Sequence, residues 1–231
     1  MITGETGLGK SMILRIIENH LNEIPEVLVA DLKRPQSSIR DFYPELGELF
    51  QVELKASNRW GSFKSIREKW NRHINSSLFR PVLIIDEAQQ MSPSVMTELR
   101  ILTSEKLDSR KILTIIIAGD QRLGEIMSTP DLLPFDSRIR VRHKLYPLSK
   151  EELSAMLHHV IQDAGNKNLM TESLINILAE HSCGNPRLMM LTADSLLSAA
   201  AQGSREQLDE SLYFEVFQER LKKPLQKRGK Q

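Results

Sequence analysis

The first residues of the chain with an obvious chemistry are glycines spaced around a lysine and a serine. Residues 4–11 read GETGLGKS, which satisfies the pattern G-x-x-x-x-G-K-[ST] at every required position, and a helix with apolar periodicity is predicted directly after it, over Met12–Leu21. Glycines let backbone N–H groups curve around phosphate oxygens, and a helix N-terminus attracts negative charge. The segment therefore predicts a site for the phosphates of a nucleotide.

Two side chains of this segment have separate expected roles. Lys10 is expected to neutralise the β- and γ-phosphates of ATP, and Ser11 is expected to reach Mg²⁺. The alternative interpretation is an ordinary glycine-rich turn. The other expected nucleotide-binding positions are Gly4, Glu5, Thr6, Gly7, Leu8, Gly9 and Met12.

A second candidate element is an apolar run that ends in two carboxylates. Val82–Ile85 has the pattern of a buried strand and is followed by Asp86 and Glu87. In a phosphate-transfer site Asp86 would hold Mg²⁺ through water, and Glu87 would orient or deprotonate the attacking water. Because strands often end in acids that cap the next helix, the pattern alone also permits a structural interpretation. Together with residues 4–11 it predicts an ATP-hydrolysing site.

Polar residues also follow another apolar run, Ile112–Ala118. Doubly wound parallel sheets bind ligands at the carboxyl ends of their strands. Asp120 or Gln121 is therefore expected to sense the γ-phosphate or to position water, with a simple turn as the alternative.

Arginines supply the remaining candidates. Arg138, Arg140 and Arg142 alternate, so an extended backbone would turn all three to one face. One of them could stabilise transition-state charge in a neighbouring subunit, or the three could form a solvated edge strand. Arg187, which follows Gly184–Pro186 at the start of a helix, could contact the nucleotide.

The elements that position these residues indicate an α/β fold, because short apolar runs alternate with longer helical segments. The first run is Val27–Ala30. After residue 149 the pattern is helical only, which predicts a P-loop parallel-sheet core over residues 1–148, an all-helical lid domain over 149–221 and a basic tail over 222–231. The predicted lid helices are Ser149–Ala164, Thr171–His181, Pro186–Ala201 and Leu208–Leu221, with Ser149, Thr171 and Asn185 at their starts.

Composition excludes several classes of protein. The chain has 231 residues, 40% hydrophobic and 26% charged, which is typical of a folded globular protein. The chain has a single cysteine, Cys183, which excludes an intrachain disulfide and favours a cytoplasmic location. We expect the side chain of Cys183 to lie in the core. The longest apolar runs are far shorter than the roughly 20 residues of a membrane-spanning helix. We therefore expect no direct membrane insertion.

Charge is unevenly distributed along the chain. The net charge is +1, but residues 219–231 carry +5, and residues 55–80 carry +6 with Trp60, Phe63 and Trp70 among the bases. Bases interleaved with aromatics suggest contact with nucleic acid. The helical spacing of four apolar residues instead favours a helix with a buried apolar stripe and with the basic residues on its solvent-exposed face. These four are Phe63, Ile66, Trp70 and Ile74.

Taken together, the motifs resemble the AAA+ ATPase superfamily, and within it the branch that contains the secretion-pathway protein A ATPases and the transposition regulators of the Mu B type. The resemblance covers nearly the whole chain, and its most specific parts are DEAQ, the strand after it and GNPR. It is carried by GETGLGKS (Gly4–Ser11), Leu83–Leu123, SRI (Ser137–Ile139), YPLSKEEL (Tyr146–Leu153) and SCGNPRLMM (Ser182–Met190).

The resemblance implies Arg138 as an arginine finger and Arg187 as a second sensor, and it places Asp120 where related proteins often have glutamine. It implies an ATP- and Mg²⁺-dependent enzyme that forms homo-oligomers on double-stranded DNA and assists a transposase or similar recombination enzyme. Two alternatives stay open: the cytoplasmic ATPase component of a secretion system, and a nucleotide-dependent binding switch with negligible turnover. The client protein is not identified.

One feature departs from the superfamily, in which a central strand precedes the P-loop. Only Met1–Thr3 precede Gly4, which leaves no room for that strand. A sheet without its central strand would expose apolar edges on both neighbours. The resemblance therefore leads us to expect a longer protein whose start lies upstream.

Overall fold

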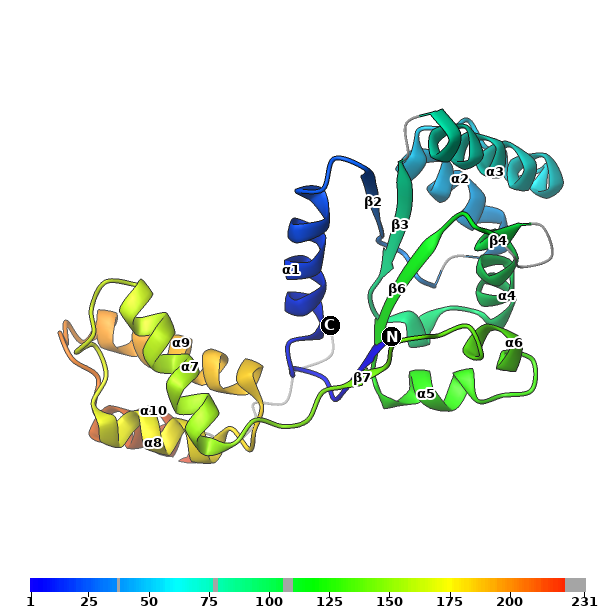
Figure 1. Ribbon diagram of the computed structural model, residues 1–231. Helices are drawn as coiled ribbons and strands as arrows, with labels where there is room; N and C mark the ends of the chain where they lie inside the picture. The colour runs from blue at the N-terminus through cyan, green and yellow to red at the C-terminus, as the bar shows by residue number, and fades with distance from the viewer. Residues whose placement is uncertain (37, 77–78, 106–109, 223–231) are drawn as a thin grey trace, which may run out of the picture. The chain divides into compact units, whose positions relative to one another are not determined.

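The structure, a computed structural model, describes residues 1–36, 38–76, 79–105 and 110–222. The chain divides into two compact units, Met1–Leu145 and Tyr146–Gln231. The first is an α/β unit and the second is built of helices (Figure 1). The predicted fold class, a parallel-sheet α/β core followed by a helical region, is confirmed.

The first unit is built on a five-stranded parallel sheet with the strand order β2-β3-β6-β1-β7 (Figure 1). The three longest strands lie over the three predicted apolar runs. The sheet strands are β1 (Ile2–Thr3), β2 (Val27–Leu32), β3 (Arg80–Ile85), β6 (Thr114–Gly119) and β7 (His143–Lys144). A separate antiparallel pair consists of β4 (Ser104–Glu105) and β5 (Arg110–Lys111).

Strand β3 is apolar at consecutive positions because helices cover both faces of the sheet. Val82 and Ile84 pack against α1 (Lys10–Asn22), whereas Leu83 and Ile85 belong to the larger core on the opposite face. That face is covered by α2 (Ile39–Phe50), α3 (Arg59–Ser76) and α4 (Pro93–Leu102) (Figure 1). Shorter connecting helices are η1 (Ala88–Gln90), α5 (Gln121–Met127) and α6 (Leu133–Asp136).

The strand that leads into the P-loop is present as β1. Ile2 pairs with Ala118 of β6 and with His143 of β7, so the three residues before Gly4 form a short strand of two residues. Two residues suffice to place the P-loop at the edge of the sheet, although β1 pairs with only the last two residues of β6. Alongside the rest of β6 lies an apolar groove of about 630 Å³. Its lining includes Met1, Ile115, Ile117, Phe135 and Ile139.

A buried carboxylate ties three helices of the larger core together. Glu98 of α4, only 3% exposed, accepts hydrogen bonds from Tyr43 Oη of α2 and from the Arg59 guanidinium of α3. Burial raises the pKa of Tyr43, and the hydrogen bond to Glu98 raises it further. The two donors satisfy a charge that would otherwise be costly to bury.

Helix α3 confirms the predicted buried stripe. Ile66 and Trp70 are fully buried, and Phe63 and Ile74 pack against the same core. Trp60, one turn before Phe63, is 74% exposed. The aromatic residues of this segment therefore divide between the core and the surface.

Over residues 146–222, the described part of the second unit, there are four helices, each within two residues of its predicted bounds. Their starts use the predicted caps: Ser149 forms a capping box with Glu152, Thr171 accepts the Leu174 N–H and Asn185 accepts the Leu188 N–H. The helices are α7 (Lys150–Asp163), α8 (Glu172–His181), α9 (Pro186–Gln202) and α10 (Glu210–Lys222).

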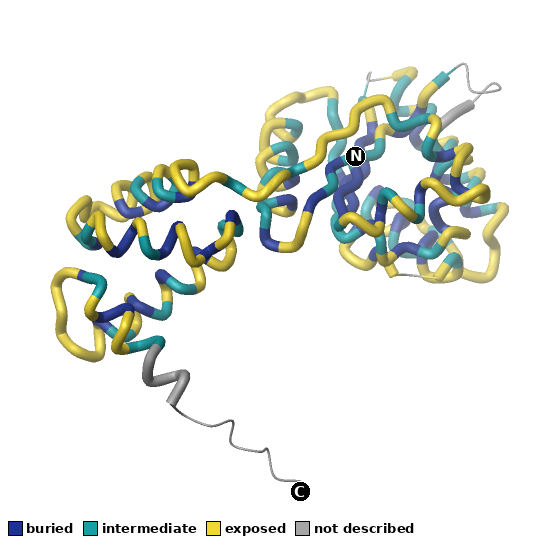
Figure 2. The backbone as a smooth tube through the Cα atoms, turned by 90° about the horizontal axis from the view of Figure 1, so that it is seen from below, coloured by how far each residue is buried: buried dark blue, intermediate teal, exposed yellow. Residues whose placement is uncertain are grey.

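Burial within the second unit follows the inward sides of its helices, drawn dark blue in Figure 2. Cys183, expected in the core, is exposed, in a left-handed turn after α8 with φ of 47°. In the parts of the chain that the structure describes, no helix combines the length and the apolar character needed to cross a membrane.

Candidate nucleotide site

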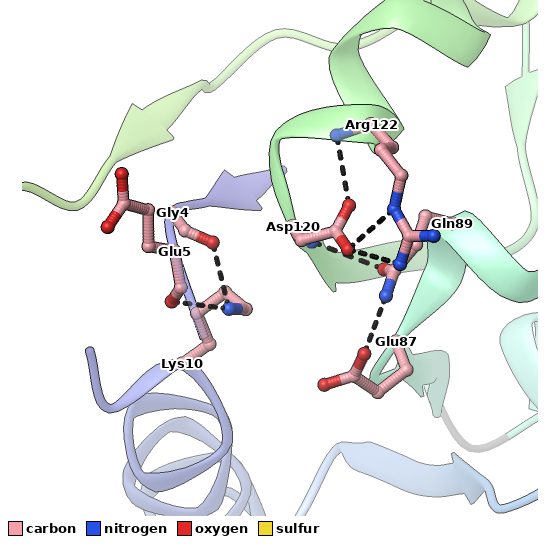
Figure 3. A network of polar contacts seen from close by, with 7 residues as sticks. All are labelled: Gly4, Glu5, Lys10, Glu87, Gln89, Asp120 and Arg122. Carbon is pink, nitrogen blue, oxygen red and sulfur yellow. Dashed lines mark hydrogen bonds and ion pairs between the residues drawn. The ribbon is translucent and has the colours of Figure 1, made fainter. Parts of the chain in front are cut away.

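Three parallel strands end at the same edge of the sheet, and polar residues follow each of them. β1 leads into the P-loop, β3 into Asp86 and Glu87, and β6 into Asp120 and Gln121. Figure 3 draws residues from all three strand ends: Lys10 and Glu87 are turned toward one another, whereas the carboxylate of Asp120 is turned toward Arg122. The structure thus brings the P-loop and both predicted carboxyl-edge segments together.

The P-loop bends at two glycines with left-handed backbone. Gly7 and Gly9 both have φ of 91°, a conformation that costs other residues about 1–2 kcal/mol. Lys10 begins α1 and is 5% exposed, and its Nζ donates to the carbonyls of Gly4 and Glu5 at 2.9 Å each (Figure 3). The loop therefore sets an ammonium group beside the N-terminus of a 13-residue helix, where anions are favoured.

The remaining P-loop positions differ in exposure. Thr6 and Met12 are exposed and Leu8 is half-buried.

Ser11 and Asp86 form a pair of oxygen groups between α1 and the end of β3. Ser11 Oγ donates to Asp86 Oδ2 at 2.5 Å, and Asp86 Oδ1 accepts the Glu87 N–H at 2.8 Å. Mg²⁺ is commonly held by one or two such groups together with water and phosphate oxygens. The pair fits this mode of binding. Among the described residues, no group of three or more His, Cys, Asp or Glu side chains forms an alternative metal cage.

Glu87 has an unusual backbone, with φ of 50° and ψ of 37°. Non-glycine residues held in this left-handed region cluster at functional sites. Its side chain is half-buried, and Oε2 accepts a hydrogen bond from Gln89 Nε2 at 2.6 Å (Figure 3).

The two candidates after β6 have different partners. Asp120 caps α5 and accepts the Arg122 N–H at 2.9 Å and Arg122 Nε at 2.8 Å. Hydrogen bonds from the Arg122 side chain hold the pKa of Asp120 below its usual range. Gln121 Nε2 donates to Glu5 Oε1 at 3.3 Å, so Gln121 is the candidate that contacts the P-loop.

The three alternating arginines do not share a strand. Arg138 lies in the turn after α6 and donates to the Arg100 carbonyl at 3.2 Å, while Arg142 forms an ion pair with Asp136 at 2.9 Å. Arg140 is exposed. The alternative interpretation, an edge strand over these three positions, does not hold, because β7 begins only at residue 143.

Arg187 belongs to the second unit. It is the second residue of α9 and is exposed.

Two residues of this network were not candidates from the sequence. Gln89 bonds to Glu87, and Arg122 clamps Asp120. For Gln89 the available signal was its place as the last residue of DEAQ, and for Arg122 it was only the spacing, two residues after Asp120.

Comparison with known proteins identifies the family. Residues 1–127 match the family model described as AAA domain. The chain belongs to this family. This chain is also similar to "General secretion pathway protein A" of Aeromonas hydrophila, with 30% identity over 212 residues. That match covers 89% of the chain but 38% of the relative, so the chain spans well under half of the relative's length.

Solved structures share the fold of this AAA domain chain at low sequence identity. Cdc6p from Pyrobaculum aerophilum has a TM-score of 0.73 at 14% identity, covering 94% of this chain and 59% of that one. The Aeropyrum pernix ORC2 protein has a TM-score of 0.68 at 17% identity, with coverages of 95% and 61%. The Thermotoga maritima RuvB Holliday junction branch migration motor has a TM-score of 0.61 at 16% identity, with coverages of 94% and 60%. These likenesses establish the AAA+ fold alone.

Proposed function

We propose that this chain binds Mg²⁺ and ATP and hydrolyses the ATP at the carboxyl edge of its sheet. The observation that carries the proposal is that Ser11, next to Lys10 at the start of α1, bonds to Asp86, which in turn bonds to the Glu87 N–H. A phosphate site, a cation site and a carboxylate next to both are the parts that phosphoanhydride hydrolysis requires.

Each group has one role in this scheme. The Lys10 ammonium binds the β- and γ-phosphate oxygens, and the backbone of the P-loop surrounds them. Ser11 and Asp86 hold Mg²⁺, which when bound neutralises charge on the phosphates. Glu87 orients the attacking water or accepts its proton.

The arginines and polar residues around this centre complete the scheme. Gln121, already in contact with the P-loop, and Asp120 are proposed to respond to the γ-phosphate. Arg187 is proposed as a second sensor from the helical unit. Arg138 is proposed to act in the site of a neighbouring copy, which makes the active form a homo-oligomer.

Two substitutions test the assignment. Lys10→Ala should abolish nucleotide binding, because it removes the phosphate countercharge. Glu87→Gln should preserve binding and lower the rate of phosphate release by about 100-fold or more, because it removes only the group that acts on water. The exposed residues Lys33 and Glu125 provide matched controls as Lys33→Ala and Glu125→Gln.

The outcomes separate the possible functions. Equal turnover by wild type and Glu87→Gln would refute the catalytic assignment. ATP binding by wild type with negligible phosphate release, with and without DNA, would support the binding switch instead.

For the pathway, we propose that the chain is the ATPase part of a secretion-type system. The support is the 30% identity to a protein named for the general secretion pathway, which extends over 89% of this chain and includes both units. Direct DNA binding is not required in this role.

The competing candidate, assembly on double-stranded DNA to assist a transposase, is favoured by one surface of α3. Exposed Trp60 stacks on Phe63 with ring centroids 5.4 Å apart, and the Arg67 guanidinium lies 5.0 Å from the Phe63 ring. Against it, several bases of this segment are engaged within the chain: Arg59 bonds to Glu98, and Lys69 donates to the Gln51 carbonyl at 2.8 Å. The basic tail adds no structural support, since residues 223–231 lie outside those described.

A titration of labelled duplex with the chain and ATP, at low and high salt, decides between the two. DNA binding predicts a slope of log affinity against log salt of about −0.9 per neutralised phosphate. It also predicts weaker binding by Trp60→Ala and a shallower slope after deletion of residues 222–231. No binding even at low salt supports the secretion role, whereas steep salt-dependent binding moves the proposal to DNA.

A further inference from the structure

The amide of Gln89 connects two of the strand ends at the site. Its Nε2 donates to Glu87 Oε2 at 2.6 Å, and its Oε1 accepts the Asp120 N–H at 3.2 Å (Figure 3). A carboxylate can only accept and a backbone N–H can only donate, so these two partners dictate which end of the amide carries oxygen. Gln89 is therefore held in one orientation by groups from β3 and from β6.

The close approach of this amide depends on a glycine. A Cβ atom added at Gly119, the last residue of β6, would lie 2.6 Å from Gln89 Oε1. Ordinary contacts begin near 3.4 Å. Glycine at this position thus leaves the space in which the Gln89 amide reaches the backbone of Asp120.

The other end of the amide acts on Glu87. Glu87 has a left-handed backbone, and its Oε2 is bound by Gln89 Nε2. The second carboxylate oxygen is turned toward the side on which Lys10 lies (Figure 3). One oxygen is therefore fixed and the other faces the P-loop side of the site.

We propose that Gln89 is a positioning residue for Glu87 and couples it to the end of β6. The inference rests on the proposed ATP hydrolysis, because it gives Gln89 a role only through the carboxylate that acts on water. Asp120 is clamped by Arg122 and follows directly on β6, so a displacement of this turn reaches Glu87 through a single amide.

Two variants of Gln89 separate its two hydrogen bonds. Gln89→Leu keeps a similar volume and removes both bonds; kcat should fall about 10- to 100-fold, as expected for lost support of a charged group, while KM and the Kd for ATP stay within about twofold. Gln89→Glu keeps an acceptor for the Asp120 N–H but sets a second carboxylate beside Glu87, and kcat should fall at least as far. Gln90→Leu, an exposed glutamine in the same turn, is the control and should match wild type.

A double-mutant comparison distinguishes positioning from a general loss of structure. In single-turnover experiments, Gln89→Leu should cause no further loss in a Glu87→Gln background, because its effect passes through Glu87. Multiplying losses would overturn the inference, and so would a Gln89→Leu variant with wild-type kcat. If the leucine variant fails to bind ATP, the nearly isosteric Gln89→Glu decides in the same way.

The inference and the proposed function fail separately. An active wild type, an inactive Glu87→Gln and a fully active Gln89→Leu would overturn the inference alone. A wild-type chain that binds ATP but does not hydrolyse it would overturn both.

Discussion

Replacing Gly119 with alanine tests whether ATP hydrolysis depends on the close contact between the end of β6 and the Gln89 amide. The new Cβ would lie 0.8 Å inside the ordinary contact limit, at 2.6 Å against 3.4 Å, so the amide must move by about that distance. Its hydrogen bond from the Asp120 N–H is already 3.2 Å long and would be lost. One such bond contributes about 1 kcal/mol, so the same amount added to the barrier lowers kcat about fivefold.

The assay is phosphate release at saturating ATP, with a nucleotide titration to count folded sites. The Cβ would also lie 2.8 Å from Leu123 Cδ2, and overpacking of this kind costs about 1–3 kcal/mol of stability, so the rate is measured well below Tm. Gly124→Ala on the adjacent helix is the control, because its added Cβ meets nothing within 4 Å and alanine favours a helix. A Gly119→Ala variant with the kcat of wild type would refute the reasoning.

Further predictions concern the backbone, the buried cluster and the subunit contact. Glu87→Gly should have a Tm roughly 2–4 °C above that of Glu87→Ala in calorimetry, because both variants lose the hydrogen bond from Gln89 and only glycine relieves about 1 kcal/mol of left-handed strain; an equal or reversed order contradicts this. The pKa of Tyr43 is raised in the folded state. Its contribution to the free energy of unfolding is therefore complete below the unfolded pKa of about 10 and is lost progressively as the pH rises above that value. Urea titrations on either side of that pH should therefore show a smaller alkaline loss of stability for Tyr43→Phe than for wild type, and an unaltered loss for the exposed Tyr146→Phe; equal losses in all three refute it. Mixing Arg138→Ala with Glu87→Gln subunits should restore part of the ATPase activity, and no recovery in mixtures shown to co-assemble argues against a role in trans.

The features that were predictable from the sequence are those encoded locally. Residues 82–85 are apolar at every position because both faces of β3 are buried, and that pattern is readable without a structure. Three helices of the second unit are readable from the sequence because Ser149, Thr171 and Asn185 cap them within three residues. Contacts between residues that are close in the sequence can be recognised from the spacing of residue types along the chain.

The features that were not predictable depend on contacts between distant segments. Ile2–Thr3 is too short to show a period of two, and its strand conformation comes from pairing with β6 and β7. The turn at Arg138 follows directly on α6, and the Arg138 N–H donates to the Phe135 carbonyl, although alternating arginines permitted a strand. The role of Gln89 depends on the end of β6, about thirty positions later in the chain, which the fold brings within hydrogen-bond distance of its amide.

The buried Glu98 predicts how this region can change in evolution. Its charge is compensated by donors on two other helices, Tyr43 on α2 and Arg59 on α3. A relative that keeps the acid but loses both donors would bury an uncompensated charge, which costs several kcal/mol. Substitutions at these three positions should therefore be correlated among AAA domain relatives of this chain: acid with donors, or apolar residues at all three.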